Sequence, residues 1–178
     1  MLKPYLKTFP QIDANVFVDD SAVIIGDVVV GEDSSIWPLV VLRGDVNAIK
    51  IGERTSIQDG SVIHVTHKSS KLPQGYLTQI GSDVTIGHRV ILHGCTLYDR
   101  CLIGMGSCVM DGAVIESDVI LGAGSLVPPQ KTLKSGHLWL GSPVRCARPL
   151  TSEEIEGILY SSRHYVKLKN NYLFEAKN

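Results

Sequence analysis

The stretch that decides the fold is IDANVFVDDSAVIIGDVVVGEDSSIWPLVVL, residues 12–42. An aliphatic residue stands at every sixth position, and this spacing resumes twice further along the chain. The recurring anchors are Ile12, Val18, Ile24, Val30, Ile36, Leu42, Ile51, Ile57, Ile63, Ile80, Ile86, Leu92, Leu97, Ile103, Val109, Ile115, Leu121 and Val127. A period of six does not fit the 3.6 residues of a helical turn, whereas it fits short parallel strands separated by turns. The pattern therefore predicts a β-helix whose anchors point inward.

Three hexapeptides per turn make a triangular prism, so the sequence predicts an all-β fold, a left-handed parallel β-helix of about six coils ending near Val127. We name its faces A, B and C in chain order from Ile12. The step from Ile63 to Ile80 is longer than six, which predicts a loop over residues 69–79 at one corner. The anchors predict a β-helix domain over residues 1–150 that includes this loop.

The last part of the chain predicts a helix. Thr151-Ser-Glu-Glu is a capping-box pattern with Glu154 three residues after Thr151. An apolar stripe follows at helical spacing: Ile155, Ile158, Leu159, Ser162, Val166 and Leu173. Residues 151–178 are therefore expected to form a C-terminal helical unit that packs on the prism or on a neighbouring subunit.

Composition narrows the function classes. The chain has 178 residues and a formal charge of −1, so we expect neither nucleic-acid binding nor attraction to an anionic membrane. The N-terminus lacks the apolar core of a signal peptide, and no apolar run is long enough to span a membrane. The four cysteines form no CxxC pair. We expect a cytoplasmic, reduced protein.

Small or β-branched residues stand four positions after nearly every anchor, for example Val40, Val46 and Ser61. His67 breaks this rule in the middle of the repeat, where the bulk of an imidazole does not suit a prism corner. His67 therefore needs a functional or loop-specific explanation.

Two histidines follow their anchors on face C. His64 comes directly after Ile63 and His93 directly after Leu92, so they are expected to stack in adjacent coils about 4.8 Å apart. Side chains alternate along a strand, so both point outward if the anchors point inward. Arg43 falls in the same column one coil earlier.

A third histidine, His88, falls on face B with Asp59 at the same offset one coil earlier. If three prisms pack in parallel as a homotrimer, face C of one chain meets face B of the next. His64 and His93 of one chain would then meet His88 of its neighbour, which is a three-imidazole metal site with an open fourth position. Zn suits such a site, as do Fe(II) and Co(II). The alternative is that these are ordinary hydrogen-bonded surface histidines.

Five stretches resemble the γ-class carbonic anhydrase-like proteins of the hexapeptide-repeat superfamily: LRGDV (42–46), SIQDG (56–60), VIHVTH (62–67), IGHRVILHG (86–94) and GSPVR (141–145). The resemblance covers nearly the whole chain. It implies that His64, His88 and His93 are metal ligands divided between subunits. It also implies a metal-dependent hydratase that converts CO2 and water to bicarbonate.

The same resemblance assigns further residues. It places Arg43 and Asp45 in a pair near the metal that also ties subunits together, and it gives Gln58 a hydrogen bond to the metal-bound water, with Asp59 beside it. Simpler roles stay open, because Arg43 and Asp45 can be only an interface salt bridge. Gln58 and Asp59 can likewise be only a turn.

The chain departs from the family pattern at two glutamates. His67 stands where the family has a glutamate proton shuttle, and Val46 replaces a second glutamate near the metal. An imidazole can shuttle protons near neutral pH, although His67 can equally be a loop hydrogen-bonding residue. The resemblance also implies a tyrosine facing the metal, for which Tyr165 and Tyr160 are the candidates. Cys95 lies two residues after His93, and its redox role stays open.

Two other functions compete with the hydratase. A hexapeptide-repeat acyltransferase that uses CoA needs one histidine as a general base, not three. A metal-binding protein acting on another small-molecule or thioester substrate would keep the histidines and lack fast CO2 hydration. Metal content distinguishes the acyltransferase from the two metal-dependent functions. A CO2 hydration assay then distinguishes the hydratase from the metal-binding protein that acts on another substrate.

Overall fold

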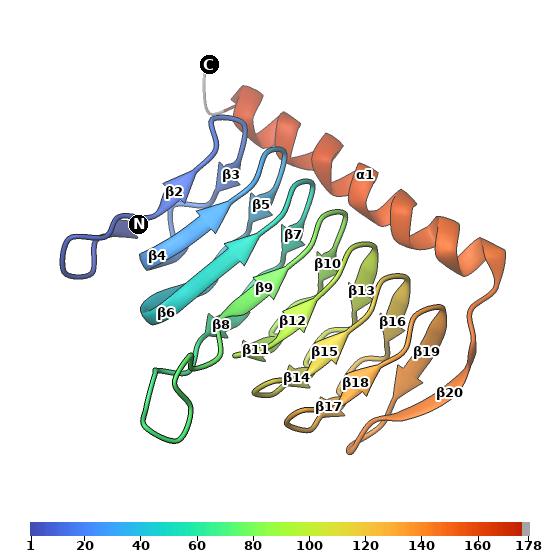
Figure 1. The fold of residues 1–178 in the computed structure, drawn as a ribbon. Helices are drawn as coiled ribbons and strands as arrows, with labels where there is room; N and C mark the ends of the chain where they lie inside the picture. Colours follow the sequence, from blue (N-terminus) through green and yellow to red (C-terminus); the bar gives the residue numbers. More distant parts are fainter. Residues whose placement is uncertain (176–178) are drawn as a thin grey trace.

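The computed structural model describes residues 1–175 and is a parallel β-helix with one α-helix running along its edge (Figure 1). The predicted all-β class with a C-terminal helix is confirmed. Helix α1 spans Ser152–Glu175, so residues 176–178 of the predicted 151–178 unit lie outside the described part. The division at residue 150 remains a proposal.

The strands fall on the three predicted faces. Face B carries seven parallel strands within the described residues: β3 (Phe17–Val18), β5 (Ser35–Ile36), β7 (Ser56–Ile57), β10 (Thr85–Ile86), β13 (Cys101–Ile103), β16 (Val119–Leu121) and β19 (His137–Leu140). Face C carries β1 (Leu2–Lys3), β8 (Val62–His64), β11 (Ile91–His93), β14 (Cys108–Val109) and β17 (Leu126–Val127). Face A carries β2 (Gln11–Ile12), β9 (Thr78–Ile80), β12 (Thr96–Leu97), β15 (Val114–Ile115) and β18 (Thr132–Leu133). The long strands β4 (Val23–Val30) and β6 (Val41–Ile51) cross the corner from face C to face A.

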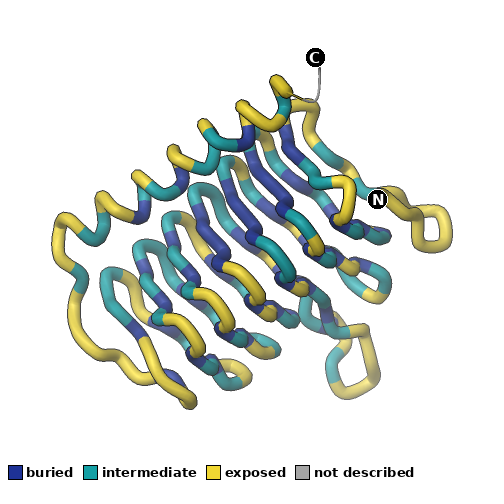
Figure 2. Tube along the Cα trace, turned by 180° about the vertical axis from the view of Figure 1, so that it is seen from behind, coloured by how far each residue is buried: buried dark blue, intermediate teal, exposed yellow. Residues whose placement is uncertain are grey.

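The anchors form the core. All of them except Ile12 and Val18 are buried, and the buried trace lines the inside of the prism in Figure 2. Where the repeat is irregular, a buried residue still stands two positions before the next anchor, as Ile49, Thr78 and Cys95 show. Val46 stands four positions after Leu42, as the small or β-branched residues of the repeat do, but the bulge in β6 leaves it 41% exposed.

The prism is longer than the six coils that the anchors predicted. After Val127 the chain pairs again, with β18 beside β15 and β19 beside β16. Leu133 and Trp139 are buried and fill the last turn. The antiparallel strand β20 (Arg145–Pro149) then covers the exposed edge of β19. The hexapeptide spacing continues through this region, but fewer aliphatic anchors mark it.

One corner of the prism, between faces A and B, is built from charged residues with left-handed backbone dihedrals. Arg54, Asp83, Arg100 and Asp118 have φ between 51° and 59°. Such dihedrals are unfavourable for residues with a Cβ. Ion pairs join Arg54 to Asp83 and Arg100 to Asp118 across adjacent coils, at N–O distances of 2.7 to 2.9 Å. These contacts stabilise turns whose backbone dihedrals glycine would adopt without strain.

Helix α1 begins at the predicted capping box, in which Thr151 Oγ1 accepts from Glu154 N at 3.2 Å and Glu154 Oε2 accepts from Thr151 N at 2.9 Å. It then runs back along face B toward the first coil (Figure 1). Its buried residues are Ile158, Ser162 and Lys169. The Lys169 side chain is fully buried, and its Nζ donates to Asp33 Oδ1 at 2.8 Å and to Asn15 O at 2.6 Å.

Among residues 1–175, α1 is the one α-helix, and it is too polar to qualify as a membrane-spanning segment.

Candidate metal centre

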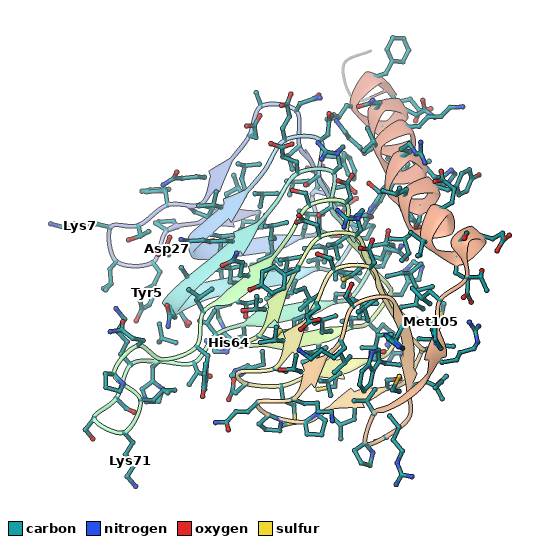
Figure 3. The ribbon with its side chains drawn as sticks, turned by 45° about the vertical axis from the view of Figure 1, so that its right-hand side comes forward. Tyr5, Lys7, Asp27, His64, Lys71 and Met105 are labelled. Atoms are coloured by element: carbon teal, nitrogen blue, oxygen red, sulfur yellow. The ribbon has the colours of Figure 1, made fainter. Side chains whose placement is uncertain are left out.

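His64 and His93 stack on face C as predicted, because strand pairing places them directly side by side on β8 and β11. His64 Nδ1 lies 3.1 Å from His93 Nε2, and the ring centroids are 5.1 Å apart. Figure 3 shows His64 on the side of the prism away from α1, near the loop that carries Lys71. The repeat therefore brings two imidazole nitrogens face to face.

Each ring of this pair has a carboxylate at its other nitrogen. Asp45 Oδ1 lies 3.0 Å from His64 Nε2, and Asp111 Oδ1 lies 2.7 Å from His93 Nδ1. The result is a hydrogen-bonded row of carboxylate, imidazole, imidazole and carboxylate. The two carboxylates at the ends of this row favour positive charge between them. A cation between the facing nitrogens suits the same electrostatics.

Arg43 lies in the same column and contacts Asp45 within its own chain. Arg43 Nη1 donates to Asp45 Oδ2 at 2.6 Å, while the other oxygen of Asp45 contacts His64. Burial raises the pKa of Asp45, but the hydrogen bonds from Arg43 and His64 together outweigh burial and hold that pKa below its ordinary value. Asp45 therefore stays ionised as a partner for His64.

His88 lies on face B, as predicted, and has its own carboxylate. Asp59 Oδ2 is 3.0 Å from His88 Nδ1, and both side chains are about half exposed. His88, Arg89, Met105 and Gly106 line a surface hollow of about 430 Å³. Across residues 1–175 of one chain, no three side chains from His, Cys, Asp and Glu converge tightly enough to hold a metal. His88 is therefore separate from the His64–His93 pair within a single prism.

Gln58 and Tyr165 lie together on face B. Gln58 is only 6% exposed, and Tyr165 approaches it from α1. Burial raises the pKa of Tyr165, a hydrogen bond with Gln58 opposes that shift, and the charge of Asp59 adds to it. Tyr160 is 67% exposed on the outer side of the helix. Of the two candidate tyrosines, Tyr165 is the one beside the predicted site residues.

His67 and Cys95 differ in exposure. His67 is exposed at the start of the loop, and within the described chain its ring makes no hydrogen bond or ion pair. Cys95 is buried in the core, and burial raises the pKa of its thiol far above the ordinary value. The Cys95 thiol is therefore protonated and shielded, which makes it a packing residue.

Sequence reasoning missed Asp111. This residue lies two positions after the anchor Val109, in the coil that follows His93 on face C. It was not considered because its motif carries no histidine and matches no stretch of the family resemblance. The available signal was an acidic residue one coil beyond His93 and one position outside the histidine column, which is occupied there by Met110.

Exposed apolar side chains surround the histidine pair on face C. Val62 is 40% exposed and Ile91 is 48% exposed, and both stand two residues before a histidine on its own strand. Leu39 and Met105 at the neighbouring corner are exposed as well. The histidine pair and exposed apolar side chains therefore lie next to one another on face C.

Comparisons with known proteins agree with this fold. The family model for the bacterial transferase hexapeptide (six repeats) matches residues 9–44. Protein YrdA of Escherichia coli is 58% identical over 97% of this chain and 94% of its own length. A carbonic anhydrase of Geobacillus kaustophilus is 41% identical over 97% of this chain and 91% of its own. A crystal structure of a hexapeptide transferase family protein from Anaplasma phagocytophilum has a TM-score of 0.89 at 46% identity, covering 96% of this chain and 97% of that one.

The prism of hexapeptide coils defines a left-handed β-helix protein of the hexapeptide-repeat superfamily. Within it, the chain belongs to the γ-class carbonic anhydrase-like family.

Proposed function

We propose that this protein is a metal-dependent hydratase of the carbonic anhydrase type, which combines CO2 with water to form bicarbonate. One observation carries the proposal. Each of the three predicted ligands, His64, His88 and His93, has one ring nitrogen on a carboxylate and the other directed elsewhere. This is the usual arrangement of metal-binding histidines, because the carboxylate fixes the ring and increases its basicity.

The facing nitrogens of the histidine pair fit a metal. Zn–N bonds of 2.0–2.1 Å in a tetrahedral site place two donor nitrogens about 3.3 Å apart. His64 Nδ1 and His93 Nε2 are 3.1 Å apart, so a small adjustment suffices. His64 and His93 would hold the metal together with His88 of a second chain. Zn is the expected ion, with Fe(II) or Co(II) as chemically suitable replacements.

A bound divalent metal would supply hydroxide near neutral pH. The residues of this chain would prepare the surroundings. The buried amide of Gln58 offers both a donor and an acceptor for water or substrate, and Tyr165 restrains it from the helix. Asp45 and Asp59 would hold the ligand rings, and Arg43 would keep Asp45 ionised.

His67 is the proposed proton carrier. Its exposed ring is not engaged by another described residue, so it is free to exchange protons with buffer. His67→Ala is expected to lower CO2 hydration several-fold at low buffer concentration, with unchanged metal content. Added imidazole buffer should restore the rate. Identical rates for the variant and the wild type at low buffer would reduce His67 to a loop residue.

The proposed assembly is a homotrimer with metal sites at its interfaces. It is supported by the separation of His88 from the histidine pair and by the exposed Val62 and Ile91 beside that pair. Packing face C against a second copy buries these side chains, which is favourable at about 25 cal/mol per Å² of apolar surface. Arg43 and Asp45 are already paired within one chain, so a role in joining subunits would need an additional contact.

The decisive experiment measures metal content and stopped-flow CO2 hydration on the same anaerobically purified sample. About one metal per chain with hydration supports the proposal. One metal without hydration would mean a different small-molecule or thioester substrate. A metal-free protein that transfers acyl groups from CoA would contradict the proposal and favour an acyltransferase.

A further inference from the structure

Asp111 joins the histidine pair to the loop between β8 and β9. Its Oδ1 accepts from His93 Nδ1 at 2.7 Å and from the Thr66 hydroxyl at 2.8 Å. Thr66 also closes the base of the loop, because its backbone exchanges two hydrogen bonds with Tyr76, at 2.8 and 3.1 Å. One carboxylate oxygen therefore contacts a predicted ligand and the first residue pair of the loop.

Gly94 leaves the space that this carboxylate occupies. Gly94 has φ of +57°, and a Cβ there would lie 2.4 Å from Asp111 Oδ1 and 2.8 Å from Tyr76 Cβ. The side chains of Asp111 and Tyr76 are thus packed directly against the backbone beside His93. The position of the carboxylate is set by packing as well as by its hydrogen bonds.

A second glycine–aspartate pair provides a matched comparison. A Cβ on Gly81 would lie 2.3 Å from Asp99 Oδ1, nearly the same as at Gly94. Asp99, however, accepts from the backbone N–H of Ser82 at 2.8 Å and contacts no histidine. The two corners share their packing and differ in what the carboxylate holds.

The contact with Asp111 decides which His93 nitrogen is free. An ionised carboxylate only accepts hydrogen bonds, so His93 must carry its proton on Nδ1. In the neutral ring, Nε2 then presents a lone pair. His93 Nε2 is the atom that faces His64.

We propose that Asp111 is a positioning residue that holds His93 in its Nδ1–H tautomer and, through Thr66, ties that tautomer to closure of the loop on the prism. Its consequence for metal binding rests on the proposed function. The tautomer itself does not, because it exists in the metal-free protein. Weakening the hydrogen bonds at the base of the loop should therefore change the tautomer of His93.

The first test is the His93 tautomer, read from long-range 15N–1H correlations of the metal-free protein at mildly alkaline pH. We expect Nδ1–H in the wild type and in Asp111→Asn, whose amide oxygen still accepts both hydrogen bonds. We expect Asp111→Ala to lose this tautomer, and Thr66→Val to lose part of it with faster exchange of the Tyr76 amide. An Asp111→Ala variant with the wild-type tautomer would overturn the proposal.

The second test is Zn²⁺ affinity by chelator competition. Asp111→Ala is expected to bind about 10–100-fold more weakly, the usual effect of losing a carboxylate behind a ligand histidine. Asp111→Asn should recover most of this loss, and the control Asp99→Ala should match the wild type. Equal Zn²⁺ affinities for Asp111→Ala and Asp99→Ala would overturn the claim that Asp111 strengthens metal binding through His93. A wild type that binds no Zn²⁺ would instead contradict the proposed function, and the tautomer would still decide the role of Asp111.

Thr66→Val separates the loop from the carboxylate. It is nearly isosteric and leaves Asp111 and His93 in place, so it tests the proposal even if Asp111→Ala fails to fold. Unchanged His93 tautomer and unchanged Zn²⁺ affinity in Thr66→Val would remove the loop from the proposal.

Discussion

Faces B and C of the prism have similar buried interiors but differ in the side chains on their outer surfaces and in how far those side chains are covered. Inside, both present stacked aliphatic anchors that are almost fully buried. Outside, the first half of face B carries the small polar residues Ser35, Ser56 and Thr85, which are buried beneath α1. Face C carries Val62 and Ile91, which remain 40% and 48% exposed. The repeat thus fixes the scaffold, and the outward residues decide what each face contacts.

The two exteriors also differ in how their charges are satisfied. On the helix side, Lys169 reaches Asp33, and Arg54 is paired with Asp83, so the charges are neutralised by the same chain. On face C, His64 and His93 have carboxylates behind them and face only each other in front. Helix α1 therefore covers part of face B and leaves His88 half exposed, whereas on face C Val62 and Ile91 remain exposed beside the histidine pair.

The largest expected effect comes from dividing the ligand set between chains. His64→Ala and His88→Ala should each lose bound metal, because two imidazoles cannot replace three. When the two variants are unfolded together and refolded as a mixture, about one site in four should combine an intact pair with an intact His88. Metal analysis of the mixture checks this. Recovery of no metal would place the site within one chain, and metal retained by His88→Ala alone would remove His88 from the site.

Adding a charge to face C should break the assembly. Ile91→Asp would bury a carboxylate without a partner in the proposed interface, which costs on the order of 3 kcal/mol or more. We expect the mass in solution, measured by light scattering, to fall from trimer to monomer. Tyr98→Asp is the matched control, because Tyr98 is 50% exposed and directly follows β12 on face A, which takes no part in the proposed contact. Dissociation by both variants, or by neither, would contradict a specific interface on face C.

Removing the buried charge beneath α1 should destabilise the chain without affecting its assembly surface. Lys169→Met keeps the apolar stem but removes the donor to the Asn15 carbonyl and the charged donor to Asp33, which keeps its hydrogen bond from Asn15 Nδ2. We expect a loss of about 1–3 kcal/mol in the free energy of unfolding, reduced by the partial exposure of Asp33. Urea denaturation measures it. Lys167→Met, an exposed substitution on the same helix, should change stability by less than about 0.5 kcal/mol.

The smallest effect concerns how stability depends on pH at the corner between faces A and B, where Arg54 pairs with Asp83. The hydrogen bonds from Arg54 lower the pKa of Asp83, burial opposes them, and the Ser162 hydroxyl adds to the lowering. A depressed folded-state pKa contributes stability above the unfolded value of about 3.9, and that stability is lost as the pH falls through the folded pKa. Asp83→Asn should therefore cost about 1–2 kcal/mol at neutral pH, with a smaller deficit below about pH 4. A deficit that stays constant on acidification would contradict this linkage.

The hexapeptide spacing predicted most of the scaffold, because a period of six specifies inward positions without any long-range information. It failed at the ends and at the bulge. Leu133 and Trp139 extend the prism past the last regular anchor, and Val46 is turned outward where β6 departs from the repeat. Leu133 and Trp139 keep the spacing of six but were missed because the run of aliphatic anchors ends at Val127. At the bulge, the register is set by pairing with the neighbouring coil, which the local sequence does not specify.

The sequence by itself determined the fold class, the stacking of His64 on His93 and the placement of His88 on another face, since all three follow from counting along a strict repeat. Only the tertiary structure decided that Asp111 contacts His93, that Tyr165 and not Tyr160 lies beside Gln58, and that Lys169 is buried against Asp33. These contacts join residues from different coils or from the helix and the prism. Their geometry depends on side-chain packing between elements, which periodicity does not encode.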